Sequence, residues 1–171
     1  MVDARRGAYV VIVVSLLGLL AYSLGGFLAG YAQLSEEPLR EAARREALLH
    51  WMYIAGEDKD RLIMQYREDA VLYWIGGPLT GVYKGLDNIS ALWDRFFNGN
   101  EDEHVRATNV RALEIQGKAY VIADVSLITT RAQTGERILL DLTYILVFVE
   151  SDRGVLIEEE WWIIDSATKL G

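Results

Sequence analysis

Two kinds of side chain in this sequence have the chemistry for acid–base work: His50, and the acids of a run near the C-terminus, Glu158 to Glu160. A histidine can take or give a proton near neutral pH, and a carboxylate in an apolar pocket can act as a general base. The run lies in a segment with strand-like composition, where successive side chains point to opposite faces. Glu159 is therefore expected on one face, and Glu158 and Glu160 on the other. His50 with Glu159 or Glu160 is the candidate catalytic pair. The simpler alternatives are a structural histidine and a solvated strand face.

The sequence offers no other recognisable reaction centre. It has no cysteine and two histidines, which excludes thiol chemistry and argues against a zinc site. The acids Glu101, Asp102 and Glu103 are consecutive, without the alternating spacing of a calcium-binding loop. No glycine-rich loop leads from a strand directly into a helix, as phosphate-binding loops do. We therefore expect neither a metal nor a cofactor.

The elements that must position these side chains are helices first and mostly strands afterwards. Apolar residues recur at helical spacing from Leu39 to Ile54, with Ser35 expected to cap the helix, and a second short helix is expected from Asp58. A third helix over 87–97 has the clearest amphipathic pattern. Its apolar face consists of Ile89, Leu92, Trp93, Phe96 and Phe97.

Strand-like segments begin after the second helix. Two short ones are expected at 70–74 and 80–83, and four longer ones at 105–116, 118–131, 136–149 and 155–165. Short turns join the last four, so these neighbours must be antiparallel. The pattern predicts an α+β fold in which three helices pack on one face of a curved antiparallel sheet.

The N-terminal part of the chain differs from the rest, so we expect a membrane anchor over 1–34 and one domain over 35–171. The run 7–34 has no charged residue and exceeds the about 20 residues that a helix needs to span a bilayer. Arg5 and Arg6 precede it and acids follow it, which by the positive-inside rule places the domain outside the cytoplasm in a single-pass protein. A cleaved signal peptide and a pilin-type leader are the alternatives.

The charge of the chain argues against nucleic acid as a partner. The formal net charge is −8; without Asp3, Arg5 and Arg6, the part after residue 35 has 15 basic and 24 acidic residues, or −9. Proteins that bind a phosphate backbone have clusters of lysine and arginine instead.

From Leu48 to Phe97 the chain resembles the SnoaL-like branch of the nuclear-transport-factor-2-like superfamily. The resemblance rests on the segments EDAVLYW (68–74) and GGPLTGVYKG (76–85) and on the helix through WDRF (93–96). The segment 152–165 is similar to the family's last hairpin, so the resemblance covers 38–166. It implies a cone in which three helices close over a concave sheet around a pocket. Family members include isomerases, cyclases, dehydratases, hydrolases and noncatalytic binding modules, and they commonly form homodimers through the sheet.

The resemblance also places the site of the steroid-isomerase relatives on this sequence. Their catalytic base falls at Trp74, whose indole cannot accept a proton, and their two hydrogen-bond donors fall near His50 and Tyr144. The missing base argues against that reaction. Aromatic residues are expected to line the pocket: Trp51, Trp74, Tyr83, Trp93 and Tyr144.

These observations favour a membrane-anchored, noncatalytic domain that binds a small apolar molecule or a protein partner. The alternative is a SnoaL-like isomerase, cyclase or hydrolase that uses His50 with Glu159 or Glu160. Such an enzyme needs an open pocket on which the histidine and a carboxylate converge. A further alternative is a pilin-like or assembly scaffold with a filled cone.

Overall fold

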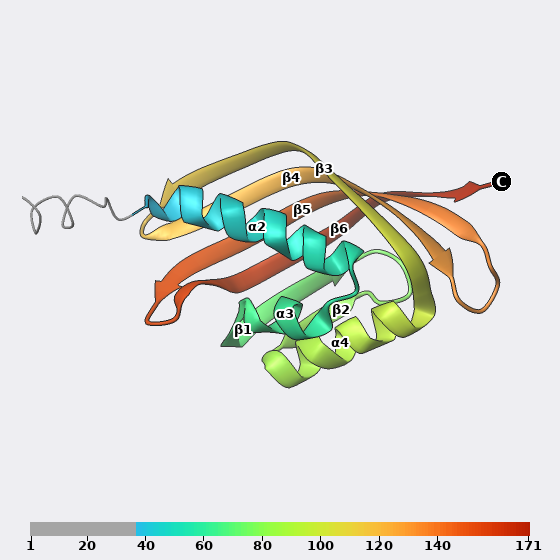
Figure 1. Cartoon of the computed structure of the whole chain (residues 1–171), viewed down its shortest axis with the longest axis horizontal. Coiled ribbons are helices and arrows are strands. Elements are labelled where there is room, and N and C mark those ends of the chain that lie inside the picture. The colour runs from blue at the N-terminus through green and yellow to red at the C-terminus, as the bar shows by residue number, and fades with distance from the viewer. Residues whose placement is uncertain (1–36) are drawn as a thin grey trace, which may run out of the picture. The chain divides into compact units, whose positions relative to one another are not determined.

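The computed structural model describes residues 37–171, in which helices cover one face of a strongly curved sheet (Figure 1). The helices of this part are α2 (Leu39–Ala55), α3 (Lys59–Met64) and α4 (Leu86–Gly99). The strands are β1 (Tyr66–Ile75), β2 (Gly81–Lys84), β3 (Asn100–Ile115), β4 (Lys118–Arg131), β5 (Arg137–Ser151) and β6 (Gly154–Leu170). The run 7–34, expected to be the membrane anchor, lies outside the described residues. Within 37–171, no helix is both long and apolar enough to cross a membrane.

The six strands form a mixed sheet in the order β2-β1-β6-β5-β4-β3. The expected antiparallel meander is confirmed for β3, β4, β5 and β6, which are joined by short turns. The expectation of a wholly antiparallel sheet was wrong, because β1 pairs in parallel with β6. A parallel pair needs a long connection, and here α4 and four strands lie between the two partners in sequence.

The first helix begins later than its sequence pattern indicated. The pattern placed the cap at Ser35, whereas α2 begins at Leu39 and Pro38 lies at its N-cap with φ −52° and ψ 135°. A proline disfavours the helical region for the residue before it, so Glu37 and Pro38 remain outside the helix.

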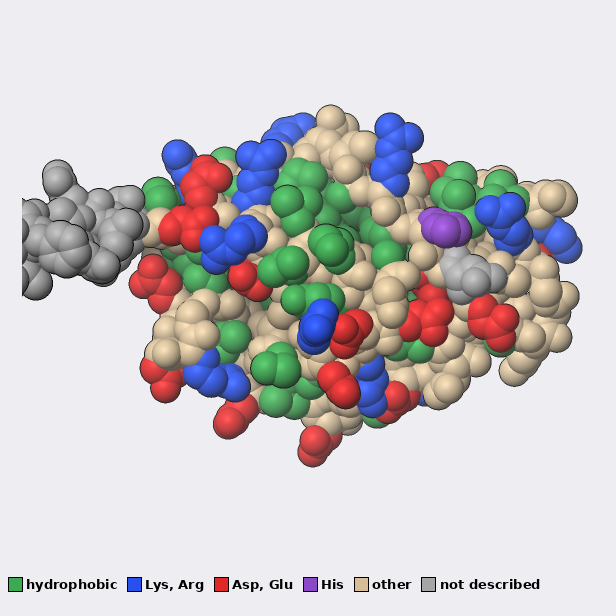
Figure 2. Space-filling model, viewed as in Figure 1, with side chains coloured by type: hydrophobic (Ala, Val, Ile, Leu, Met, Phe, Trp, Pro, Cys, Tyr) green, Lys and Arg blue, Asp and Glu red, His purple; other side chains and the backbone are tan. Residues whose placement is uncertain are grey.

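The core lies between the helices and the concave face of the sheet. The amphipathic pattern of α4 is confirmed, with Ile89, Leu92, Trp93 and Phe96 buried and Phe97 partly buried. Strand β5 contributes Leu142, Tyr144, Leu146 and Phe148 from alternate positions. The inner faces of α2, α4, β1, β5 and β6 point toward one another, and some of their polar side chains meet inside the core. Charged side chains of both signs lie on the face of the domain that Figure 2 shows.

Candidate functional site

A buried polar cluster occupies the interior between α2 and the sheet. His50 comes from the inner face of α2, Gln65 ends α3, Tyr66 begins β1, and Tyr144 and Glu160 project inward from β5 and β6. His50, Tyr144 and Glu160 are fully buried, and Tyr66 is 1% exposed. Burial of this many polar groups is tolerable only if they satisfy one another's hydrogen bonds.

The cluster is connected through Glu160. Tyr66 donates a hydrogen bond to Glu160 Oε2 and Tyr144 donates one to Glu160 Oε1. His50 Nε2 lies 3.4 Å from Glu160 Oε1 and 3.0 Å from the Tyr144 hydroxyl. Trp93 Nε1 donates to the Tyr66 hydroxyl over 3.1 Å. Each oxygen of the carboxylate therefore has a donor.

The hydrogen bond between His50 and Gln65 shows which ring nitrogen carries a proton. His50 Nδ1 lies 3.0 Å from Gln65 Oε1. Gln65 Nε2 donates to the backbone oxygen of Glu46 over 2.9 Å, which assigns the amide orientation and leaves Oε1 as an acceptor only. His50 Nδ1 must therefore be the donor in its bond to Gln65.

Tyr144 connects His50 to Glu160. Its hydroxyl lies 3.0 Å from His50 Nε2 and donates to Glu160 Oε1. These contacts have the geometry of a proton relay, and they also pair the buried polar atoms with one another.

The two tyrosines are held in their protonated, donating form. Burial raises the pKa of Tyr66 well above its ordinary value, and the charge of Glu160 raises it further. Burial also raises the pKa of Tyr144 well above its ordinary value, and the charge of Glu160 raises it further.

The three glutamates of β6 are separated by a β-bulge. Val147 pairs with Glu159 and Phe148 with Ile157, so Glu158 is the extra residue of β6. Glu160 points inward, which is one of the two orientations that strand alternation allowed for this run of glutamates. The expectation that Glu158 shares its face was wrong, because the bulge breaks the alternation. Glu158 pairs with Arg67 at 2.9 Å and with Lys118, and the half-buried Glu159 accepts from Trp161 Nε1 at 3.3 Å.

A layer of aromatic rings separates the polar cluster from the cavity at the open end of the cone. Trp74 stacks on Trp162 with ring centroids 4.2 Å apart, and Trp162 packs against Tyr144 at 5.1 Å. Trp74 also contacts Phe96, and Phe96 contacts Trp93. Trp74 and Phe96 line the cavity on their other side. The histidine and the glutamate converge, but neither lines this cavity.

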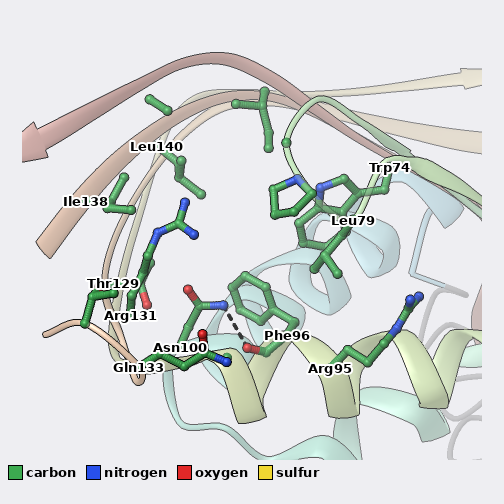
Figure 3. Close-up of a pocket in the computed structure, with 16 residues that line it drawn as sticks. Trp74, Leu79, Arg95, Phe96, Asn100, Thr129, Arg131, Gln133, Ile138 and Leu140 are labelled. Carbon is green, nitrogen blue, oxygen red and sulfur yellow. Dashed lines mark hydrogen bonds between the residues drawn. The ribbon is translucent and has the colours of Figure 1, made fainter. Parts of the chain in front are cut away.

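The cavity itself is a pocket of about 300 Å³ between the end of α4, the turn after β1 and the β4–β5 hairpin (Figure 3). Phe96, Leu79 and Trp74 form one side in Figure 3, and Ile138 and Leu140 lie opposite. Its remaining lining residues are Gly77, Pro78, Arg95, Gly99, Asn100, Thr129, Arg131, Gln133, Thr134, Ile164 and Ala167. The lining combines apolar side chains with a few polar ones, as in sites for small molecules.

One of the five predicted pocket residues lines the cavity, and the other four lie elsewhere. Trp74 lines the pocket. Trp93 and Tyr144 belong to the aromatic layer and the polar cluster, and the buried Trp51 packs edge-on against Tyr144 at 5.9 Å. Tyr83 is half-buried on β2, where Arg95 lies over its ring at 5.4 Å.

Sequence reasoning missed two members of the cluster and most of the pocket. Gln65 and Tyr66 follow a short helix in a segment without regular alternation, and no signal marked them. Arg131 was visible beside the turn Gln133-Thr134-Gly135, but nothing in the sequence showed that this hairpin would meet the end of α4.

No family model matches the chain, and no curated protein matches it either. Solved structures do resemble it. A hexachlorocyclohexane dehydrochlorinase of Novosphingobium barchaimii is 20% identical with a TM-score of 0.66, covering 79% of this chain and 95% of its own. A ketosteroid isomerase-like protein of Erwinia carotovora is 19% identical with a TM-score of 0.62, covering 75% and 95%. A candidate scytalone dehydratase of Novosphingobium aromaticivorans is 13% identical with a TM-score of 0.67, covering 77% and 87%.

Identities this low establish the fold alone. The neighbours named here are mostly enzymes by name, and the part of each that matches is nearly its whole length. Residues 37–171 therefore have the cone-shaped fold of the SnoaL-like and nuclear-transport-factor-2-like proteins.

Proposed function

We propose that this domain binds a small, largely apolar molecule in the pocket at the open end of the cone, without catalysing a reaction. The observation that carries the proposal is the separation of the pocket from the acid–base groups. The pocket has about 300 Å³ of space and includes several apolar side chains in its lining, while His50 and Glu160 lie behind the Trp74–Trp162 stack with no exposed surface. A reacting atom must come within hydrogen-bond reach of a catalytic base, and a ligand in this pocket would meet indole and phenyl rings instead.

Titration calorimetry with naphthalene-1-carboxamide, a neutral flat probe, tests this proposal on the full-length chain in detergent. Gly99→Trp adds a large ring to the pocket lining at a position where a Cβ meets no atom within 4 Å. Ala91→Trp is the matched control, because it adds the same ring to the exposed face of the same helix. We expect binding to the wild type and to Ala91→Trp, and its loss in Gly99→Trp. Equal heats in all three proteins would mean that the probe enters the detergent and not the pocket.

We further propose that the run 7–34 anchors the domain in a membrane as a single-pass helix, with residues 35–171 outside the cytoplasm. The support is the absence of charge over a run longer than the about 20 residues of a membrane-spanning helix. Cell fractionation tests it. The full chain should resist extraction with alkaline carbonate, and a chain that lacks 1–34 should be soluble. Release of the full chain by carbonate would refute the anchor.

Association of two copies through the outer face of the sheet is also part of the proposal. Tyr73 and Trp161 stack there with ring centroids 3.9 Å apart, beside the half-buried Ile145 and Ile163. Trp161→Arg should convert the dimer to a monomer in analytical ultracentrifugation. An unchanged sedimentation mass would contradict this interface.

An enzyme is the second candidate, and one observation favours it. The His50–Tyr144–Glu160 relay contains the groups of a general acid and base within 3.0–3.4 Å of the imidazole Nε2. It would act only if the aromatic layer opened to admit a substrate. The accessibility of His50 in solution separates the two candidates, as described below.

A further inference from the structure

The lining of the pocket has a charge opposite to that of the chain as a whole. The chain has 25 acidic and 17 basic residues. Among the described residues that line the pocket there are two arginines, Arg95 and Arg131, and no aspartate or glutamate. A concave, largely apolar site with a positive charge favours an anionic ligand.

Arg131 is the arginine whose charge is available to a ligand. In Figure 3 its guanidinium group lies in the pocket, between Leu140 and Asn100. Its ionic partner within 37–171 is Glu136, at 3.9 Å from Nε, and Glu136 itself pairs with Lys169 at 2.9 Å. The two terminal amino groups of Arg131 make no hydrogen bond to any described residue. They are the donors that bind carboxylates in a bidentate manner.

The hairpin between β4 and β5 holds Arg131 in this position. The Arg131 amide donates to the Glu136 carbonyl over 2.9 Å, and the Gly135 amide donates to the Arg131 carbonyl over 2.9 Å. Gly135 has a φ of +67°, which favours glycine and closes the turn. The backbone of the arginine is therefore fixed before a ligand binds.

Arg95 is engaged elsewhere. Its guanidinium group lies 5.4 Å from the centre of the Tyr83 ring, in cation–π contact. In Figure 3 it extends away from Arg131, on the far side of Phe96. We therefore expect Arg95 to contribute less to the recognition of an anion than Arg131.

Trp74 adds an indole ring to the lining, close to Leu79 in Figure 3. The side chain is 2% exposed, and its buried Nε1 has no hydrogen-bond partner among the described residues. The ring therefore offers a ligand an apolar surface, and Arg131 supplies the charged donors.

We propose that the natural ligand is an organic acid: an apolar body that lies against Phe96 and Leu140, with an anionic oxygen group bound by Arg131. This inference rests on the proposed binding function and specifies the chemical class of its ligand. An apolar amine or a neutral hydrocarbon would leave the terminal amino groups of Arg131 without an acceptor.

The test compares two probes of nearly equal shape and different charge, 1-naphthoate and naphthalene-1-carboxamide. Calorimetry is performed on the full chain, on Arg131→Gln and on Arg111→Gln. The heat measured with Gly99→Trp, whose pocket is blocked, gives the contribution of probe that partitions into the detergent. Arg111 is exposed on β3 and does not line the pocket, so it controls for the loss of one positive charge. A hydrogen-bonded charge is worth about 1.5–3 kcal/mol, or about 10-fold to 100-fold in Kd.

The expected result is that the wild type and Arg111→Gln bind 1-naphthoate at least about 10-fold more tightly than the amide. Arg131→Gln should lose this preference and bind the amide with a Kd within about 2-fold of the wild type. Equal affinity of the wild type for both probes, or a preference that survives in Arg131→Gln, would overturn the organic-acid inference while the binding function stands. Failure of the wild type to bind either probe would overturn both.

Discussion

His50 Nε2 lies 3.4 Å from Glu160 Oε1, and both side chains are fully buried. Such a pair in an open pocket would be read as a catalytic dyad. Here the Tyr66, Tyr144 and Gln65 side chains complete its hydrogen bonds, and no part of it lines the cavity of the cone. The same two residues thus form a buried polar contact that links α2 to β6.

Removal of the charge of Glu160 should weaken the fold substantially. Glu160→Gln leaves two tyrosine donors and the imidazole without a carboxylate, and the loss of one partner from a buried pair costs about 3–5 kcal/mol. Thermal unfolding of the full chain, followed by near-ultraviolet circular dichroism, measures this cost. Glu159→Gln is the control on the same strand and should stay within about 1 kcal/mol of the wild type. Equal stability of the two variants would show that the cluster does not stabilise the domain.

The two histidines of the chain provide a test of access to the cluster. Diethyl pyrocarbonate modifies imidazole groups that solvent reaches, and mass spectrometry locates the product. His104 is exposed on β3 and should react quickly, whereas His50 should stay unmodified until the protein unfolds. Comparable rates at the two histidines in the native protein would show that the aromatic layer opens, and would favour the enzyme.

Stability should depend on pH through Glu103. Burial, followed by a hydrogen bond to Glu57, raises the pKa of Glu103 from 4.5 to about 7. Because the folded state then binds this proton more tightly than the unfolded state, the stabilisation is complete below about pH 4.5 and is lost as the pH rises toward 7. Each pKa unit is worth about 1.4 kcal/mol.

The control is Glu103→Gln, which carries no titratable group at this position. The difference between the melting temperatures of the wild type and this variant should change from pH 5 to pH 8, in favour of the wild type at the lower pH. A difference that is constant over this range would mean that Glu103 titrates alike in the folded and unfolded chains.

The turn after β1 should tolerate no side chain at Gly76. Gly76 has a φ of +98°, and an added Cβ would lie 3.0 Å from the Cβ of Ile164, a residue of the pocket lining. Gly76→Ala should therefore cost about 1–3 kcal/mol. Gly99→Ala, in a helix and with open space around its Cβ, should be neutral or slightly stabilising. The melting temperatures of the two variants measure this difference. A loss of stability in Gly99→Ala as large as that in Gly76→Ala would contradict the expected strain at position 76.

Periodicity was a reliable guide to the elements that bury one continuous face. The spacing of Leu92, Trp93 and Phe96 and the alternation along β5 lead directly to the observed core. The parallel pairing of β1 with β6 left no comparable signal, because period-2 alternation is the same in parallel and antiparallel strands. The bulge at Glu158 was invisible for a similar reason: it depends on the register against Val147 and Phe148 and not on the local sequence.

The site was harder to predict than the fold because it depends on contacts far apart in the sequence. His50, Tyr144 and Glu160 were each identified as candidates, and the structure brings them together over separations of 94 and 16 residues. Whether the cone is open above them depends on how Trp74 and Trp162 stack, which is a matter of side-chain packing between β1 and β6. Pocket residues such as Arg131 lie on a hairpin that composition alone marks only as a turn.

The location of a bound ligand tests the central claim most directly. Nuclear Overhauser effects between the ring protons of 1-naphthoate and the methyl groups of the protein report contacts within about 5 Å of the ligand, the range of direct side-chain packing. We predict contacts to Leu79, Ile138 and Leu140 in the pocket, and none to Ala47 or Leu146, which are buried near His50 and Glu160. Contacts to Ala47 or Leu146 would place the ligand beneath the aromatic layer and contradict the account.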